Sequence, residues 1–167
     1  MVRLGARDIA YAGIIGALYA VLTIALSPIS YGVYQVRVAE ALTVLPFLYP
    51  FAIIGLFIGC LLANIFGGNG LQDIVFGSVF TLVAGYLTYL TSKIKSEEVG
   101  IALAPLPPVI INAFGVAIYL SKITGMSYFF VVQMIGAGQL IACYILGIPL
   151  LLLLRSRTPS RMSDESI

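Results

Sequence analysis

The sequence predicts an all-α membrane protein, a bundle of six transmembrane helices in which the second helix is short. Of its 167 residues, 60% are hydrophobic and 10% are charged, whereas a soluble domain is roughly 45–50% apolar and about 25% charged. The mean hydropathy is +1.07, and the apolar residues lie in long uncharged runs. We expect residues 1–155 to form one membrane domain and residues 156–167 to form a polar cytoplasmic tail.

The first apolar run covers residues 9–27. Asp8 precedes it as the expected N-cap, and Ser27 followed by proline ends it. The run is long enough to remain as a membrane span rather than serve as a cleaved signal. A polar loop over residues 29–38 follows.

The next apolar stretch, residues 41–66, contains Pro46 and Pro50. A proline inside a helix removes a backbone donor and clashes with the preceding turn. We therefore expect two helices, the first over residues 39–49. At 1.5 Å per residue it is only about 16 Å long, so it must be packed among other helices rather than cross a ~30 Å hydrocarbon core alone.

A glycine-rich break at residues 67–70 separates this stretch from the remaining apolar runs, residues 74–92, 100–120 and 129–154. Lys and Arg concentrate in cytoplasmic loops. Six spans place seven of these residues inside and two outside, whereas five spans place three inside and six outside. The six-span topology with both termini cytoplasmic is therefore favoured. Its inner residues are Arg3, Arg7, Lys93, Lys95, Arg155, Arg157 and Arg161, and its outer ones are Arg37 and Lys122.

Several kinds of chemistry are excluded by composition. There is no His, which excludes His-based metal sites and Ser–His pairs. Cys60 and Cys143 each lie inside an apolar run and are expected to be small buried side chains. No nucleotide-binding glycine loop occurs, and a net charge of +2 does not indicate nucleic-acid binding. We expect no metal, no cofactor and no enzymatic activity.

Polar side chains gather in the outer half of the six-span bundle, while the inner half is almost purely apolar. This arrangement suits the capture of a small polar molecule from outside better than a channel, which needs a polar path through the whole membrane. The alternative is that these side chains only form hydrogen bonds between helices. The candidate substrate-binding residues are Gln35, Arg37, Glu40, Asn64, Asp73, Asn112, Gln133 and Gln139.

Two features near the outer face allow more than one interpretation. Arg37 and Glu40 are three residues apart and could pair with each other instead of a ligand. The rim aromatics could form an interfacial belt or a lid that stacks on a flat ligand. They are Tyr31, Tyr34, Tyr128 and Phe129.

Small residues recur at spacing four on two of the expected helices, a pattern that permits close helix contact. The second of these stripes is Gly55, Gly59 and Ala63. Such stripes serve either internal packing or docking to another membrane protein. The first helix has two adjacent stripes, more than one neighbour requires, which makes it the candidate partner-docking surface: Ala12, Gly13, Gly16, Ala17 and Ala20.

The segment YGVYQVRVAEALTVLP at residues 31–46 resembles the QueT branch of the S-components of energy-coupling factor (ECF) transporters. Residues 64–73, followed by Phe76-Gly77-Ser78, are also similar to that family. The resemblance implies a substrate-binding subunit in a prokaryotic cytoplasmic membrane. It would bind a queuosine precursor, a 7-deazaguanine in its 7-aminomethyl or 7-cyano form. It would dock through its first helix to an EcfT-type transmembrane subunit driven by two cytoplasmic ATPases.

The candidate residues suit such a ligand on chemical grounds. A guanine edge presents two adjacent donors and one acceptor, and a carboxylate can accept both donors. Glu40 or Asp73 would be this carboxylate, with amides serving the acceptor and Arg37 orienting a carboxylate. A carboxylate could also hold an aminomethyl cation. The alternatives are an S-component for a vitamin-like ligand, a stand-alone secondary transporter and, last, an intramembrane enzyme.

Overall fold

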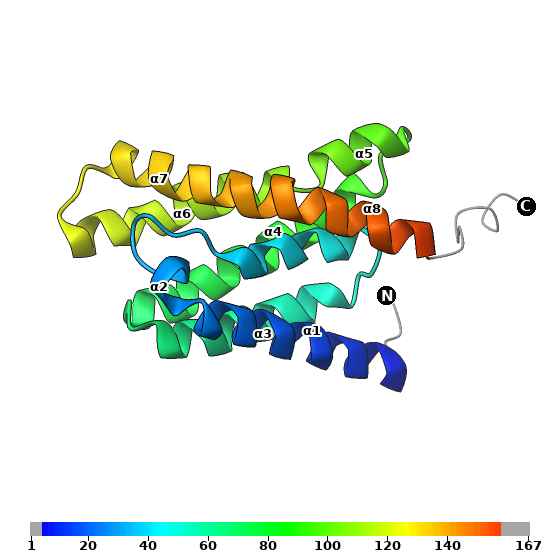
Figure 1. Cartoon of the computed structure of the whole chain (residues 1–167), viewed down its shortest axis with the longest axis horizontal. Coiled ribbons are helices and arrows are strands. Elements are labelled where there is room, and N and C mark those ends of the chain that lie inside the picture. Colours follow the sequence, from blue (N-terminus) through cyan, green and yellow to red (C-terminus); the bar gives the residue numbers. More distant parts are fainter. Residues whose placement is uncertain (1–4, 158–167) are drawn as a thin grey trace, which may run out of the picture.

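The computed structural model describes residues 5–157, and every regular element in that range is helical (Figure 1). The elements are α1 (Ala6–Ala25), α2 (Ser27–Ser30), η1 (Val38–Phe47), α3 (Ala52–Gly67), η2 (Asp73–Gly77), α4 (Ser78–Thr91), α5 (Glu97–Leu103), α6 (Leu106–Thr124), α7 (Tyr128–Leu140), η3 (Ile141–Gly147) and α8 (Ile148–Arg157). η1 is a 3₁₀-helix, and η2 and η3 are π-helical. The predicted polar tail begins at residue 156, but its first two residues belong to α8, and residues 158–167 lie outside the described residues.

Four helical stretches within the described residues are long and apolar enough to cross a membrane: Ala6–Ala25, Asp73–Thr91, Glu97–Thr124 and Tyr128–Arg157. η1 and α3 are apolar but shorter. The prediction of an all-α membrane protein is therefore confirmed, whereas the count of six spans stays a prediction. The start of α1 and the end of α8 lie at the same end of the bundle (Figure 1).

The beginning of α1 differs from the expectation that Asp8 is the N-cap. The helix begins at Ala6, with Gly5 as N-cap, and Asp8 Oδ2 accepts a hydrogen bond of 3.0 Å from the Gly5 backbone N–H. A carboxylate in the first turn can satisfy that free N–H and also favours the positive end of the helix dipole. Asp8 therefore caps the helix from inside its first turn.

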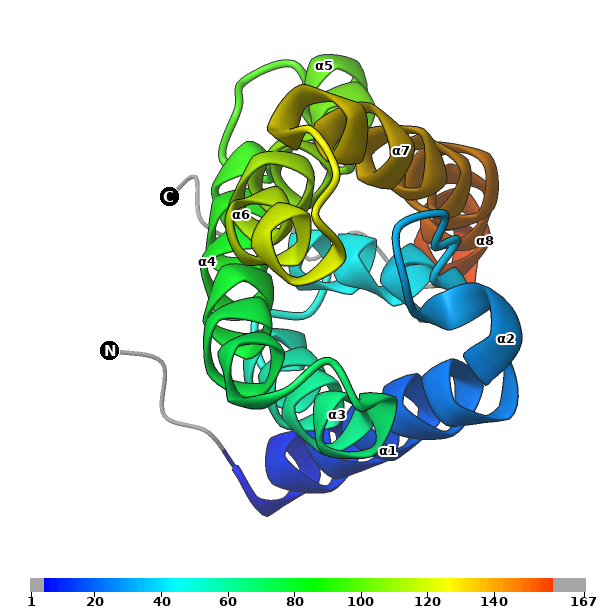
Figure 2. The same ribbon diagram turned by 90° about the vertical axis from the view of Figure 1, so that its left-hand side faces the viewer.

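The predicted break between Pro46 and Pro50 is confirmed, but the expected α-helix over residues 39–49 is the 3₁₀-helix η1. Pro46 has no N–H and its ring conflicts with α-helical packing against the preceding turn, while the Thr43 hydroxyl donates to the Glu40 carbonyl at 2.6 Å. A 3₁₀-helix of this length is uncommon, and ten residues of it rise about 20 Å. All of its residues from Ala39 to Phe47 are buried, because η1 lies in the middle of the bundle and contacts α1, α3, α4, α8 and η3 (Figure 2).

Two irregularities depart from the single helices predicted over residues 100–120 and 129–154. The first run is broken before Pro105 into α5 and α6. The second stays helical but widens to a π-helix over η3, just before Pro149. A proline cannot donate to the carbonyl one turn back, and a local π-turn accommodates that loss without ending the helix.

The small-residue stripes pack α1 directly against α3. A Cβ atom at Gly16 would lie 2.8 Å from the Gly55 carbonyl oxygen, and one at Gly59 would lie 2.5 Å from the Gly16 carbonyl oxygen. No side chain fits at such a distance. Ala12, Gly16 and Ala20 are therefore buried within the bundle, while Gly13 and Ala17 remain exposed.

Candidate functional site

Seven of the eight predicted site residues are buried: Gln35, Arg37, Glu40, Asn64, Asp73, Asn112 and Gln139. We call these side chains the polar cluster. They come from the loop before η1, from η1 itself and from α3, η2, α6 and α7. Gln133 is exposed, because α7 turns Val131 and Ile135 inward and a residue two positions from each points the other way. The structure therefore does not bring Gln133 to the cluster.

Glu40 lies at the centre of the cluster and is only 1% exposed. Its Oε1 accepts a hydrogen bond of 2.5 Å from the Tyr19 hydroxyl on α1. Its Oε2 accepts one of 3.1 Å from the Asn112 side-chain amide on α6. The carboxylate thus links η1 to two other helices through neutral donors, and it retains lone pairs for further donors.

Asp73 is the second buried carboxylate, at the first residue of η2. Its Oδ1 accepts from the Tyr119 hydroxyl at 2.5 Å, and its Oδ2 accepts from the Asn69 amide at 3.0 Å. A Cβ atom at Gly77 would lie 2.9 Å from Asp73 Oδ1 and 2.9 Å from Asn64 Nδ2. The glycine therefore leaves the space in which the Asn64 amide lies beside Asp73.

Arg37 is buried but poorly paired. Its Nε donates to the Ser30 carbonyl at 3.4 Å, its Nη1 lies 3.9 Å from Cys60 Sγ, and its guanidinium carbon is 5.5 Å from the centre of the Tyr31 ring. Among residues 5–157 it forms no ion pair, so the pairing of Arg37 with Glu40 considered from the sequence is not formed. A guanidinium carries five N–H donors, and most of these remain available to another acceptor.

Three buried polar atoms have no hydrogen-bond partner among the described residues: Asn64 Oδ1, Gln35 Oε1 and Ser30 Oγ. The Asn64 amide nitrogen, by contrast, donates to the Asp73 carbonyl at 2.9 Å and contacts Cys60 Sγ at 3.4 Å. An unpaired buried polar group costs about 1–3 kcal/mol. Buried polar atoms without partners, together with two buried carboxylates and a guanidinium without an ion pair, are features that a binding site for a polar ligand requires.

The side chains that contact the cluster but were missed from the sequence include Tyr19, Cys60, Asn69 and Tyr119. Cys60 precedes Asn64 by four residues and Tyr119 follows Asn112 by seven, so each shares a helix face with a predicted residue, and that spacing could have identified them. Tyr19 has no such signal, because its partner Glu40 lies on another element.

The segment of residues 31–37 crosses from α3 to α7. The Tyr31 hydroxyl donates to the Ala63 carbonyl at 2.6 Å, and partial burial raises the pKa of this phenol above its ordinary value. At the other end, a side chain at Gly138 would clash with the Gln35 carbonyl. Between them, the exposed Tyr34 packs edge-on against Phe130 at 6.2 Å. The predicted rim aromatics therefore include residues that anchor this segment as well as exposed ones.

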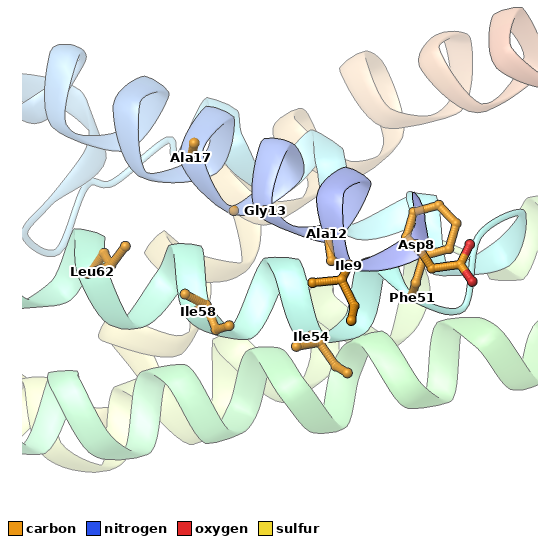
Figure 3. A pocket seen from close by; sticks show the side chains of 10 residues that line it. Asp8, Ile9, Ala12, Gly13, Ala17, Phe51, Ile54, Ile58 and Leu62 are labelled. Atoms are coloured by element: carbon orange, nitrogen blue, oxygen red, sulfur yellow. The ribbon is translucent and has the colours of Figure 1, made fainter. Parts of the chain in front are cut away.

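A second feature is an apolar groove of about 290 Å³ on the surface of the bundle, between α1 and α3 (Figure 3). Gly13 and Ala17 lie along α1, and Ile54, Ile58 and Leu62 face them from α3. Asp8 and Phe51 mark one end of the groove in the view of Figure 3. Four of the five predicted docking residues line this groove, namely Ala12, Gly13, Gly16 and Ala17, and of these Gly13 and Ala17 are exposed.

Comparison with known proteins identifies the family. The sequence profile of the QueT transporter family matches residues 9–156. A curated relative, the queuosine precursor transporter QueT of Lactococcus lactis subsp. cremoris, is 40% identical over 78 residues, a segment that is 46% of each chain. That segment covers less than half the length of the relative. No solved structure matches. Because the family profile covers most of the chain and the fold contains several helices apolar enough to span a membrane, this multi-pass membrane protein belongs to the QueT transporter family.

Proposed function

We propose that the chain is the substrate-binding subunit, or S-component, of an ECF-type importer and captures a queuosine precursor, a 7-deazaguanine, from outside the cell. The observation that carries the proposal is the polar cluster, which holds two carboxylates, a guanidinium without an ion pair and two amide oxygens without hydrogen-bond partners among the described residues. The family membership and the name of the Lactococcus relative support this ligand class.

The cluster offers partners for every polar atom of a guanine edge. A carboxylate accepts the ring N–H together with the exocyclic amine. We assign this role to Glu40, at the centre of the cluster. Arg37 has free donors for the ring carbonyl, a role different from the orientation of a carboxylate expected from the sequence. Gln35 Oε1 and Asn64 Oδ1 accept from the remaining donors.

We infer that the end of the bundle carrying α2 and the connection between α6 and α7 faces outside (Figures 1 and 2). Among the described residues, Lys122 near the end of α6 is the only exposed cation at this end of the bundle. The opposite end carries Arg7, Lys93, Lys95, Arg155 and Arg157. Because cytoplasmic loops are rich in Lys and Arg, this asymmetry supports cytoplasmic termini.

Energy for uptake would come from a partner, because the chain has no nucleotide-binding motif. We propose that an EcfT-type transmembrane subunit, driven by two cytoplasmic ATPases, docks in the α1–α3 groove. The groove is apolar, and Gly13 and Ala17 allow a partner helix to approach the α1 backbone closely.

Equilibrium binding to the purified protein tests the proposed function. We expect 7-deazaguanines with a 7-aminomethyl or 7-cyano group to bind at micromolar concentration or below, with guanine and adenine competing weakly. Mass spectrometry of ligand co-purified with the protein identifies the alternatives, since a vitamin would indicate an S-component for another ligand. Failure of every 7-deazaguanine to bind overturns the proposal, and ion-driven uptake by this chain alone in vesicles would favour a secondary transporter.

Filling the α1–α3 groove should separate docking from ligand binding. We expect the pair Gly13→Phe and Ala17→Phe to abolish co-purification with the transmembrane partner while ligand affinity stays within about twofold, because neither residue contacts the polar cluster. Ala137→Phe, an exposed alanine on α7, is the matched control. Undiminished co-purification of the double variant would exclude this groove as the docking site.

A further inference from the structure

A groove of about 380 Å³ lies between α6 and the helical stretch that η2 and α4 form together. We call it the α4–α6 groove. α4 packs against α6, and in Figure 2 these two helices lie on the left flank of the bundle, whereas α1 lies at the bottom. The α4–α6 groove is therefore separate from the α1–α3 groove that we assign to the transmembrane partner.

Most of the α4–α6 groove is apolar. Phe76 and Phe80 line it from the η2–α4 side, and their rings stack with centres 6.5 Å apart. A Cβ atom at Gly115 on α6 would lie 2.7 Å from the Phe80 ring, so the glycine leaves the space that this ring occupies. Tyr119 also lines the groove, but its hydroxyl donates to a carboxylate of the polar cluster. This part of the groove therefore suits an apolar occupant.

Two polar side chains lie at one end of the groove. Gln72 directly precedes η2, and Lys122 lies two residues before the end of α6. Both side chains are exposed. Lys122 forms no ion pair within residues 5–157, and it is the exposed cation at the end of the bundle that we place outside. The groove thus combines an apolar slot with a positive charge at its outer end that no residue in the described range neutralises.

The length of the groove corresponds to part of one lipid leaflet. From Gly115 to Lys122 the α6 backbone rises about 10 Å, which is a third of a hydrocarbon core of ~30 Å. The two stretches that flank the groove, Asp73–Thr91 and Glu97–Thr124, are each long and apolar enough to cross a membrane. In a bilayer, acyl chains therefore lie beside the apolar slot, and lipid headgroups lie level with the lysine at its outer end.

We propose that the α4–α6 groove binds one anionic phospholipid of the outer leaflet, with an acyl chain along its aromatic wall and the phosphate at Lys122 and Gln72. An ammonium is a compact charge with three donors, which suits a phosphate, and the glutamine amide adds further donors. A headgroup with a net negative charge complements the lysine, whereas the cation of a zwitterionic headgroup is repelled by it. The site depends on the outward orientation of this end and is independent of the ligand of the polar cluster.

Fluorescence quenching by brominated lipids tests the proposal, because the chain contains no tryptophan. Phe76→Trp reports on the groove. Phe129→Trp is the matched control, the same substitution at an exposed position near the start of α7 that does not line the groove. The variants are placed in phosphatidylcholine vesicles that contain brominated phosphatidylglycerol or brominated phosphatidylcholine. We expect the relative binding constant at Phe76→Trp to favour phosphatidylglycerol at least about fivefold, which is what one basic residue near an anionic lipid surface contributes. At Phe129→Trp the two lipids should quench equally.

A second substitution locates the preference. Adding Lys122→Gln to Phe76→Trp should reduce the preference to within about twofold, whereas adding Lys95→Gln, the loss of an exposed cation at the opposite end of the bundle, should preserve it. Equal quenching by the two lipids in the groove would indicate annular lipid only and would overturn the proposal. A preference that survives Lys122→Gln would overturn it as well. Absence of quenching by both lipids would indicate that a second copy of the chain covers the groove, which also contradicts the proposal.

Native mass spectrometry decides the question without a tryptophan probe if Phe76→Trp fails to fold. The unmodified full chain in detergent should retain one phosphatidylglycerol molecule in preference to phosphatidylcholine, and Lys122→Gln should lose that preference. Equal retention of the two lipids by the unmodified chain would overturn the proposal.

Discussion

Glu40→Gln is expected to lower the affinity for the 7-deazaguanine ligand by about tenfold or more, because a hydrogen bond to a charged group is worth about 1.5–3 kcal/mol. The loss has a second cause in the structure. Tyr19 and Asn112 both donate to the carboxylate, and a glutamine turns its own N–H donors toward one of them. The substituted side chain therefore keeps one accepting oxygen in place of two, which the ligand and the two former partners must share.

Ligand titration of the variant measures this effect, and circular dichroism melting shows whether the bundle is retained. Asn112→Leu provides a graded comparison, since it removes one donor to Glu40 but keeps the carboxylate. We expect its affinity to fall less than that of Glu40→Gln. An affinity unchanged in Glu40→Gln would remove Glu40 from the binding site and leave it a structural link between η1, α1 and α6.

Gly55→Leu is expected to have the largest effect on folding. A Cβ atom at Gly55 would collide with the Ala12 backbone, so α1 and α3 must separate over their whole contact. Overpacking a core usually costs about 1–3 kcal/mol and occasionally more. Here the obstacle is backbone rather than a movable side chain, so we expect the upper end of that range and a sharply reduced yield of monodisperse protein in detergent.

The thermal unfolding midpoint and the size-exclusion profile measure the outcome. Gly13→Leu is the matched control, because it introduces the same side chain on α1 at a position with no heavy atom within 4 Å of the new Cβ. We expect its midpoint to stay near that of the unmodified chain. Equal midpoints for the two variants would show that the close approach of α1 and α3 contributes little to stability.

The spacing of the small residues could not distinguish between internal packing and docking to another membrane protein. A period of four places residues on one helix face, but it does not say which neighbour meets that face. In the structure Gly16 packs against the α3 backbone, whereas a Cβ atom at Gly13 would meet no heavy atom within 4 Å.

The polar cluster shows which of the candidate site residues could be predicted from composition and from depth along the spans. Burying a polar group in an apolar bundle costs free energy, so polar residues inside the predicted spans are expected to serve a purpose there. Choosing candidates by their depth along the spans gave eight residues, of which seven are buried. Gln133 was grouped with them because depth carries no information about the direction in which a helix face points.

Local chemistry along the chain was sufficient for the membrane class, the all-helical fold, the break between Pro46 and Pro50, and the burial of seven of the eight candidate polar residues. Each of these follows from hydrophobicity or from a proline that acts on its own neighbours. The pairing of Glu40 with Tyr19 and Asn112 was decided by the tertiary structure. It depends on two contacts between residues 21 and 72 positions apart, and such distances are set by the packing of helices that no single segment encodes.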